Sequence, residues 1–509
     1  MSNSLINTQM KTIKYFKLLG FIALILLTAT HSFAQITLPH IIGSNMVIQA
    51  NKPINIWGQA NAGEQVTVQF MNQTKKTITD NTGRWKVVLD PIKATSKSAE
   101  MTITGKNTIK LENVLVGEVW ICSGQSNMEF SLAKGLSWKT GVNDWEKEVA
   151  EANYPELRLF MVKIKKSDTP LTDCEGEWVV CTPKNVGTFS AVGYYFGRYL
   201  TQQLHQPVGM VETSVGGTRA ELWTKMKVME SDTLYNVVFD QYKSDLKKFE
   251  AYSVAAKQWS EKTNNGKDTT VKIAPPVKVG QPSKPACLWN AMVEPLLPLT
   301  IKGAIWYQGE SNEPQAYDYR FVFANMINSW RKEWKQGDFP FYYVQIAAHK
   351  DKTPLLRYSQ TYVLKTVKNT GMAVATDSGD SLNIHPRNKT IIGERLAYWA
   401  LAKDYGFKNV TYSGPVYKSM KINGKTIELA FDYAEKGLMT KDGDLKEFEI
   451  AGADKQFYPA TAMIHGNNVI VSSPHITLPV YARYAWKNFM HPNFYNQQGL
   501  PAVPFNTEK

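Results

Sequence analysis

Two residues of this chain have the types that acyl transfer requires, and each follows a short apolar run. The run Val114–Cys122 ends in Ser-Gly-Gln-Ser-Asn, which places Ser126 just beyond a predicted strand. His385, in a His-Pro pair, follows a later run. A hydroxyl that attacks a carbonyl needs a base that takes its proton and returns it to the leaving group. We therefore predict that Ser126 is a nucleophile and His385 is its base, in preference to His491, which lies in a second His-Pro pair near the C-terminus.

Acyl transfer also needs hydrogen-bond donors for a tetrahedral oxyanion. Gly216-Gly217 and Asn312 each follow an apolar run of their own. The N–H groups of Ser126 and of Gly217 (or Gly216), with the Asn312 amide, would supply three donors, each worth about 2.7–4 kcal/mol of barrier. Each residue also has an ordinary structural explanation, since Ser and Gly-Gly form turns and Asn can cap a helix. The prediction therefore depends on all of them meeting at one edge of a sheet.

Two carboxylates precede the histidine and are candidates for the acid that orients it. Asp380 stands five residues before His385, and Asp377 stands eight residues before it. A carboxylate bonded to Nδ1 holds an imidazole in the tautomer that a general base needs. We favour Asp380 because it is nearer and follows flexible Gly379. Asp377, or a Ser–His dyad with a backbone carbonyl in the third role, stays as an alternative.

The elements that must position these residues alternate between apolar strands and helices. Such alternation predicts a parallel sheet with helices on both faces, and ligands bind at the carboxyl ends of its strands. The predicted strands are 114–122, 208–212, 301–307, 341–346 and 372–376, and the predicted helices are 187–204, 316–334, 355–369 and 388–403.

Regions of β character flank this α/β core. Residues 36–110 alternate apolar and polar positions between turn signals, which predicts a small β-sandwich. Residues 406–480 return to strand signals, and whether they pack on the first region stays open. The predicted division is a signal peptide at 1–34, a β-sandwich domain at 36–110, the α/β domain at 111–405 with an inserted segment at 231–285, and a C-terminal β region at 406–509.

The N-terminal segment has the pattern of a secretory signal peptide. Three lysines precede the apolar run 18–27, and Ser32-Phe33-Ala34 forms a small-x-small cleavage site. The run is too short to cross a membrane comfortably. We expect export to the periplasm or the extracellular space, without a membrane span.

Charge and cysteine usage exclude some classes of site. The net charge is +13, but the basic residues are scattered, so we expect no nucleic-acid partner. No CxxC pair suggests zinc, and we predict no metal and no cofactor. Cys174 and Cys181 are close enough in sequence to form a disulfide in an oxidising compartment, whereas Cys122 and Cys287 have the apolar neighbours of buried thiols.

The motifs together resemble those of a known family. "GQSNM" with Ser126, "VGGTRAELW" with Gly217, "IWYQGESN" with Asn312 and "IHPRNK" with His385 are similar to the blocks of the SGNH hydrolases, and within them of the sialate O-acetylesterase-like carbohydrate esterases. The resemblance implies a flavodoxin-like (SGNH) three-layer α/β fold, here with flanking β-sandwich-type regions. It also implies metal-free hydrolysis of O-acetylated sugars. One departure is Leu382, which stands where many SGNH enzymes have the orienting Asp.

Further residues near these blocks are candidate substrate contacts, namely Gln125, Glu310 and Arg219. Arg219 could pair with a substrate carboxylate, although a structural salt bridge is an equal alternative. We expect a serine esterase that removes O-acetyl groups from carbohydrate, most consistent with a sialate O-acetylesterase-like enzyme. The alternatives are an acetylesterase of xyloglucan or xylan, and a glycan-binding module without catalysis.

Overall fold

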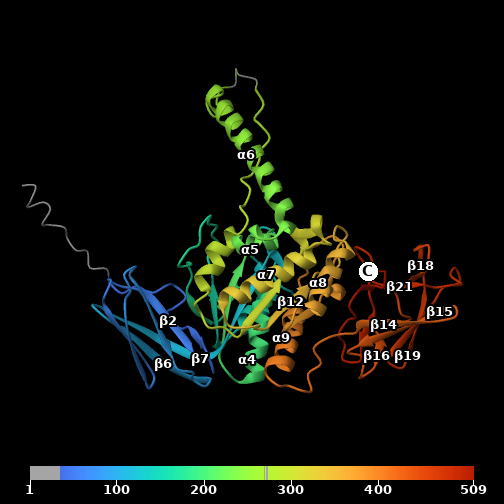
Figure 1. The fold of residues 1–509 in the computed structure, drawn as a ribbon, viewed down its shortest axis with the longest axis horizontal. Coiled ribbons are helices and arrows are strands. Elements are labelled where there is room, and N and C mark those ends of the chain that lie inside the picture. The colour runs from blue at the N-terminus through green and yellow to red at the C-terminus, as the bar shows by residue number, and fades with distance from the viewer. Residues whose placement is uncertain (1–34, 269, 271–272, 509) are drawn as a thin grey trace, which may run out of the picture.

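A five-stranded parallel sheet forms the centre of the molecule (Figure 1). The computed structural model describes residues 35–268, 270 and 273–508, so the predicted signal peptide lies outside the described residues. The strands lie in the order β10-β7-β11-β12-β13, which is the flavodoxin-like order 2-1-3-4-5. All five predicted strands are confirmed, as β7 (Thr108–Gly124), β10 (Val208–Ser214), β11 (Gly303–Tyr307), β12 (Phe341–Gln345) and β13 (Thr370–Val374).

Two further strands that the sequence analysis did not predict extend the sheet beyond β10. β8 (Tyr154–Met161) pairs in parallel with β10, and β9 (Trp178–Cys181) pairs antiparallel with β8. An antiparallel edge strand is common on sheets of this kind.

Helices cover both faces of the sheet and complete three layers. Alternate residues of β7 point to opposite faces, so Trp120 and Cys122 enter one apolar cluster, whereas Val119 and Ile121 enter the other. The first cluster includes residues of α4 (Ala191–Leu204) and α9 (Thr390–Asp404), and the second includes residues of α7 (Tyr319–Trp334) and α8 (Pro354–Thr366). These helices agree with the four that the sequence predicts. The shorter helices α2 (Ser126–Glu129), α3 (Trp145–Glu151) and α5 (Met226–Glu230) lie in the connections.

The N-terminal β region shares a strand with the central sheet. β7 is 17 residues long and crosses the boundary predicted at residue 110. Its first half pairs with β6 and its middle with β1, while its second half pairs with β10 and β11. The other strands of this region are β1 (Val47–Gln49), β2 (Ile54–Gln59), β3 (Gln65–Phe70), β4 (Gln73–Ile78), β5 (Arg84–Leu89) and β6 (Thr95–Thr104).

The C-terminal β region lies at the opposite end of the molecule from the N-terminal one (Figure 1). It contacts the loops that follow β12 and β13: Ala348 joins its apolar core, and the Tyr495 hydroxyl lies 3.3 Å from an oxygen of Asp377. The two β regions are therefore separate bodies. The strands of the C-terminal β region are β14 (Val416–Asn423), β15 (Thr426–Asp432), β16 (Leu438–Thr440), β17 (Phe448–Ala451), β18 (Phe457–Pro459), β19 (Thr461–His465), β20 (Asn468–Ser472), β21 (Tyr481–Tyr484), β22 (Phe494–Asn496) and β23 (Phe505–Asn506).

The segment predicted as an insertion contains the long helix α6 (Asn236–Lys262), which projects from the body (Figure 1). Val238 is the one residue of this helix that is buried. Across the described part of the chain, no helix combines the length and apolar character that a membrane span requires.

The four cysteines are free and buried, so the disulfide that the spacing of Cys174 and Cys181 allowed is not formed. Cys174 lies in the apolar cluster on one face of the sheet, and Cys181 lies in the cluster on the other face. The sheet therefore separates two residues that are close in sequence. Burial raises the pKa of the Cys174 thiol and of the Cys181 thiol to about 12. Cys122 and Cys287 are buried thiols, as predicted.

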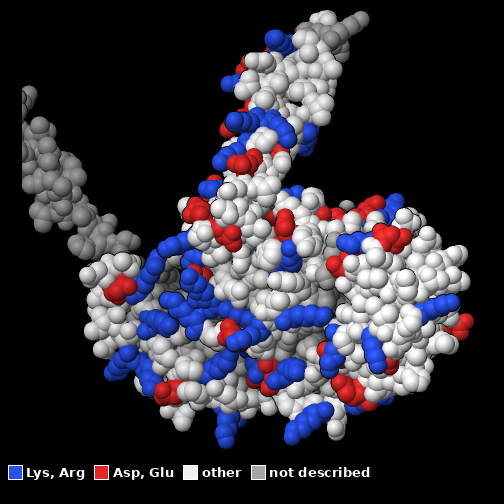
Figure 2. Space-filling view, turned by 45° about the vertical axis from the view of Figure 1, so that its right-hand side comes forward, with Lys and Arg blue, Asp and Glu red and all other residues white. Residues whose placement is uncertain are grey.

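Basic and acidic side chains are interspersed over the face seen in Figure 2. Lys and Arg gather most densely between the N-terminal β region and the central body, where acidic residues are few (Figure 2).

Candidate active site

Ser126 and His385 meet at the carboxyl edge of the central sheet. Ser126 is the first residue of α2, directly after β7, and its Oγ lies 2.8 Å from His385 Nε2. Both line a cavity of about 590 Å³, which also includes the Gly216-Gly217 pair. The serine and histidine predicted from distant parts of the sequence are thus within hydrogen-bond distance.

The turn between β7 and Ser126 is fixed by glycine and by the neighbouring strand. Gly124 has φ of 142°, and a Cβ at this position would lie 2.2 Å from the carbonyl oxygen of Tyr307 on β11. The Gln125 N–H donates to that same carbonyl at 3.0 Å. The Gln125 side chain, a predicted substrate contact, accepts from the Ser311 N–H at 3.3 Å and lines the cavity. These contacts tie the Ser126 turn to the loop after β11.

Two backbone N–H groups at the cavity are candidates for holding an oxyanion. Ser126 lies in the first turn of a helix, where N–H groups lack intrahelical partners. Gly217 has φ of 71°, a backbone conformation that suits glycine, and it lines the cavity. The Gly216 N–H donates to Glu129 Oε2 at 2.6 Å. Of the two glycines, Gly217 is the one whose N–H is not bound to that carboxylate.

The Asn312 side chain belongs to a buried hydrogen-bond network beside the cavity. It is buried, and its amide nitrogen donates to Glu221 Oε2 at 2.9 Å. Its oxygen accepts from the Ala220 N–H at 3.0 Å and from the Gln308 amide at 2.6 Å. The side chain therefore ties the β11 loop to the segment after the glycine pair. Ser311 lines the cavity in this part of the chain, and a role for Asn312 as an oxyanion donor stays a prediction.

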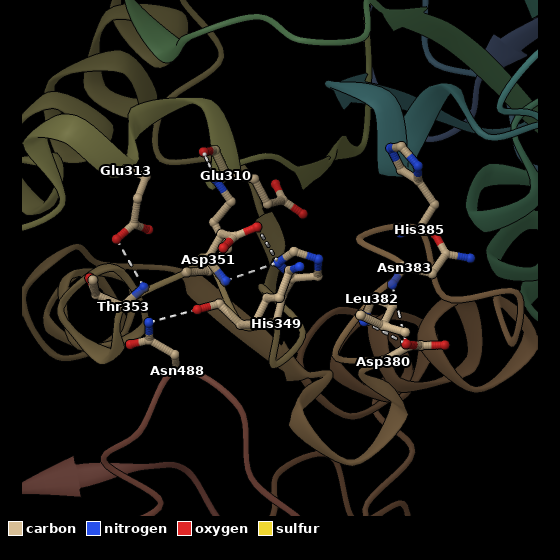
Figure 3. A network of polar contacts seen from close by, with 12 residues as sticks. Glu310, Glu313, His349, Asp351, Thr353, Asp380, Leu382, Asn383, His385 and Asn488 are labelled. Carbon is tan, nitrogen blue, oxygen red and sulfur yellow. Dashed lines mark hydrogen bonds and ion pairs between the residues drawn. The ribbon is translucent and has the colours of Figure 1, made fainter.

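Neither predicted acid lies against His385. Asp380 is exposed, and its Oδ1 accepts from the N–H groups of Leu382 and Asn383 at 2.8 and 3.2 Å. These two hydrogen bonds lower the pKa of Asp380. Figure 3 shows the His385 ring pointing away from this carboxylate.

The alternative acid is held by a different partner. Asp377 forms a two-pronged ion pair with Arg395, with both N–O distances 2.7 Å and both side chains at most 9% exposed. Among the residues that the structure describes, no carboxylate accepts a hydrogen bond from His385 Nδ1. The arrangement in the structure is thus a Ser–His dyad.

A buried network holds the other side of the histidine loop. The Asn127 amide donates to Glu310 Oε1 at 2.7 Å and to the carbonyl of Ile384, the residue before His385, at 3.0 Å. The Asn127 oxygen accepts from Lys389 Nζ at 2.5 Å. Because Asn127 follows Ser126 directly, one side chain ties the nucleophile to the loop that carries the base.

A lysine and a glutamate are buried together within this network. Burial lowers the pKa of Lys389 to about 7, and the Glu310 carboxylate acts in the opposite direction. Burial likewise raises the pKa of Glu310, whose Oε2 has no hydrogen-bond partner among the described residues. Glu310 lines the cavity, which is consistent with its predicted contact to substrate.

The surroundings of His385 favour its neutral form. Burial lowers its pKa to about 4, and the nearby Lys389 charge adds to this effect, whereas Glu129 opposes it. Trp138 lies against the imidazole, with ring centroids 4.6 Å apart. A neutral imidazole at pH 5 and above is the form that can accept a proton from Ser126.

Charged residues at the cavity differ from those expected. Arg219 is not among the described residues that line it, whereas Lys352 is, and Lys352 Nζ donates to the Glu310 carbonyl at 3.0 Å. Glu129 also lines the cavity and pairs with Lys139 at 2.8 Å. The sequence analysis named none of Asn127, Glu129, Trp138, Lys352 and Lys389, although Asn127 and Lys389 lie inside the motifs "GQSNM" and "IHPRNK".

Comparison with known proteins assigns the chain to a family. Residues 116–268 and 287–402, more than half of the chain, match the family described as "Carbohydrate esterase, sialic acid-specific acetylesterase". The chain belongs to this family. The matched residues contain Ser126, Gly217, Asn312 and His385.

Relatives of the esterase match nearly its whole length. A sialate O-acetylesterase from Mus musculus is 31% identical over 88% of this chain and 90% of the relative, and one from Homo sapiens is 30% identical over 91% of each. A carbohydrate acetylesterase of known crystal structure from Xanthomonas citri is 33% identical, covers 93% of this chain and 99% of its own, and has a TM-score of 0.78. The chain is therefore a carbohydrate esterase with the α/β fold of this group.

Proposed function

We propose that this esterase is an exported serine enzyme that removes O-acetyl groups from sialic acid. The observation that carries the serine mechanism is the 2.8 Å contact between Ser126 Oγ and His385 Nε2 in a cavity at the carboxyl edge of the sheet. The family and the sialate O-acetylesterase relatives support the choice of substrate. The signal-peptide pattern of residues 1–34 supports export.

In the first half of the reaction, Ser126 Oγ attacks the acetyl carbonyl carbon, and its proton passes to His385 Nε2. The N–H groups of Ser126 and Gly217 hold the negative charge that develops on the carbonyl oxygen. His385 then gives the proton to the departing sugar oxygen, which leaves an acetyl group on Ser126.

In the second half, His385 takes a proton from water, and the hydroxide attacks the acetyl group. The proton returns to Ser126 Oγ as the bond to the acetyl carbon breaks, which releases acetate. His385 begins each half-reaction as a neutral base, a form that its lowered pKa of about 4 favours.

The test is acetate release from O-acetylated sialic acid, acetylated xyloglucan and p-nitrophenyl acetate, measured for the wild type beside Ser126→Ala. We expect release from the sialic acid ester that disappears in the variant. Release from xyloglucan alone would replace sialic acid by a plant polysaccharide. No release from any ester would favour the glycan-binding alternative, and full activity in the variant would refute the serine mechanism.

A further inference from the structure

A cavity larger than the one at Ser126, of about 870 Å³, lies between the N-terminal β region and the central domain. One wall is formed by β2 and β5, and the facing wall by residues 170–173 and 294–298. No described residue lines both this cavity and the one at Ser126. We call it the interdomain cleft. Its volume is in the range of cavities that hold small-molecule ligands.

The wall on β2 and β5 includes Trp57 and Trp85, and on one face Trp57 lies among polar side chains. The antiparallel pairing places Trp57 opposite Lys86, and Gln59 opposite Arg84. Residues directly opposite in such a pair share a face of the sheet, and these four are two apart along their strands, so all four share one face. Trp57 is half-buried and the other three are exposed. The alternate residues, such as Trp85, are buried in the core.

The acidic groups of the interdomain cleft already have partners. Asp173 pairs with His40 at 2.6 Å, and Glu294 accepts from the Trp289 indole at 2.6 Å. Asp80 accepts from the N–H groups of Thr82 and Arg84 at 2.8 and 3.0 Å.

The basic groups do not have such partners. The guanidinium of Arg84 and the ammonium of Lys86 form no ion pair and no hydrogen bond with another residue that the structure describes. The cleft thus presents two cations without a hydrogen-bonded partner beside Trp57, and the Arg84 charge also acts on the Asp80 carboxylate in the same lining.

We propose that the interdomain cleft binds an acidic oligosaccharide, with Trp57 against a sugar ring and with Arg84 and Lys86 facing a carboxylate. A tryptophan combines a flat apolar face with a polar edge, which suits a sugar ring. Arg and Lys donate charge-assisted hydrogen bonds to carboxylates. The cleft holds the glycan at a second point while the Ser126 cavity hydrolyses its esters. The choice of an acidic sugar rests on the proposed function, whereas the binding itself does not.

Binding is measured by calorimetry on the full-length protein carrying Ser126→Ala, with sialyllactose and neutral lactose as probes. We expect sialyllactose to bind, and its affinity to fall about tenfold with Trp57→Ala and about tenfold with Arg84→Gln plus Lys86→Gln. Trp57→Phe retains most of the affinity. The matched control is Lys76→Gln, an exposed lysine on β4 that does not line the cleft and leaves the affinity unchanged.

Three outcomes would overturn the proposal. Sialyllactose affinity that survives both sets of substitutions places all binding elsewhere. Equal affinity for lactose, unaffected by Arg84→Gln plus Lys86→Gln, refutes the acidic class of ligand. A loss with Lys76→Gln as large as that with Arg84→Gln plus Lys86→Gln shows that surface charge, and not the cleft, is responsible. None of these results depends on esterase activity, so failure of the cleft and failure of the serine mechanism are distinguishable.

Discussion

The His385 loop is held in two different ways on its two sides. On the side of Ser126, the Ile384 carbonyl accepts from Asn127, which also contacts buried Glu310 and Lys389. On the other side, Asp380 is exposed and is bonded to its own loop. The base is therefore positioned from the nucleophile's side of the cavity, without a carboxylate at Nδ1.

This difference shows what an orienting group must supply. A triad carboxylate fixes the ring and stabilises the imidazolium that forms. Asn127 fixes the backbone beside the ring, but it offers no negative charge, and Lys389 adds a positive one. We therefore expect an esterase whose base is well placed and neutral over a wide pH range, and whose imidazolium is less stabilised than in a triad.

The largest expected effect is that of His385→Ala. Removal of the base should lower kcat for p-nitrophenyl acetate by about 10⁴-fold or more, as removal of the base does in serine hydrolases. The measurement is steady-state hydrolysis with circular dichroism as a check on folding. His491→Ala is the matched control, because His491 is exposed and in the same dipeptide, and it should retain activity. An equal loss in both variants would contradict the assignment.

Lys389→Met should have a smaller effect with a distinct pH signature. Burial is the main cause of the lowered His385 pKa and the Lys389 charge adds to it, so removal of that charge lets the pKa rise above about 4. The acid limb of kcat/KM should move to higher pH, and kcat should fall by about 10–100-fold as Asn127 loses a partner.

The control for Lys389→Met is Lys403→Met. Lys389 precedes α9 and Lys403 lies in its last turn, so Lys403→Met should leave the acid limb of kcat/KM and the value of kcat unchanged. An acid limb that stays in place in Lys389→Met would show that this charge does not act on the base.

The smallest effects on activity are expected for substitutions of Asp380 and Asp377. Asp380→Asn and Asp377→Asn should each change kcat by less than about threefold, because neither carboxylate contacts His385, whereas loss of a triad aspartate costs about 10⁴-fold. Asp377→Asn should still lower the free energy of unfolding by about 3–5 kcal/mol, since it breaks the buried pair with Arg395.

Denaturant unfolding and steady-state kinetics separate these two effects. A drop in kcat of several thousandfold in Asp380→Asn would mean that this carboxylate reaches His385 during catalysis, and would refute the dyad.

The sequence was sufficient where a local pattern determines the structure. The apolar runs predicted the five core strands, and the rule that ligands bind at carboxyl ends brought Ser126, Gly217 and His385 to one cavity. The edge strands β8 and β9 were missed. β8 is buried only from Leu157 to Phe160 and β9 has four residues, so neither gives a clear alternation.

The partners of side chains were harder to predict, because they depend on packing between distant segments. Asp380 and Asp377 are nearly equivalent in the sequence. In the structure, Asp377 forms an ion pair with Arg395 on α9, and Asp380 accepts a hydrogen bond from the Leu382 N–H. Lysine is usually a surface residue, yet Lys389 is buried and donates to Asn127, which lies 262 positions away in sequence. No local pattern carries that information.

The most direct measurement of the central claim is to trap the covalent intermediate. The esterase is mixed with excess p-nitrophenyl acetate, quenched in acid within milliseconds, digested and examined by mass spectrometry. We predict that the peptide containing Ser126 gains one acetyl group, and that the gain is absent in Ser126→Ala and accumulates more slowly in His385→Ala. An acetyl group found on another residue, with Ser126 unmodified while the enzyme turns over, would contradict the account.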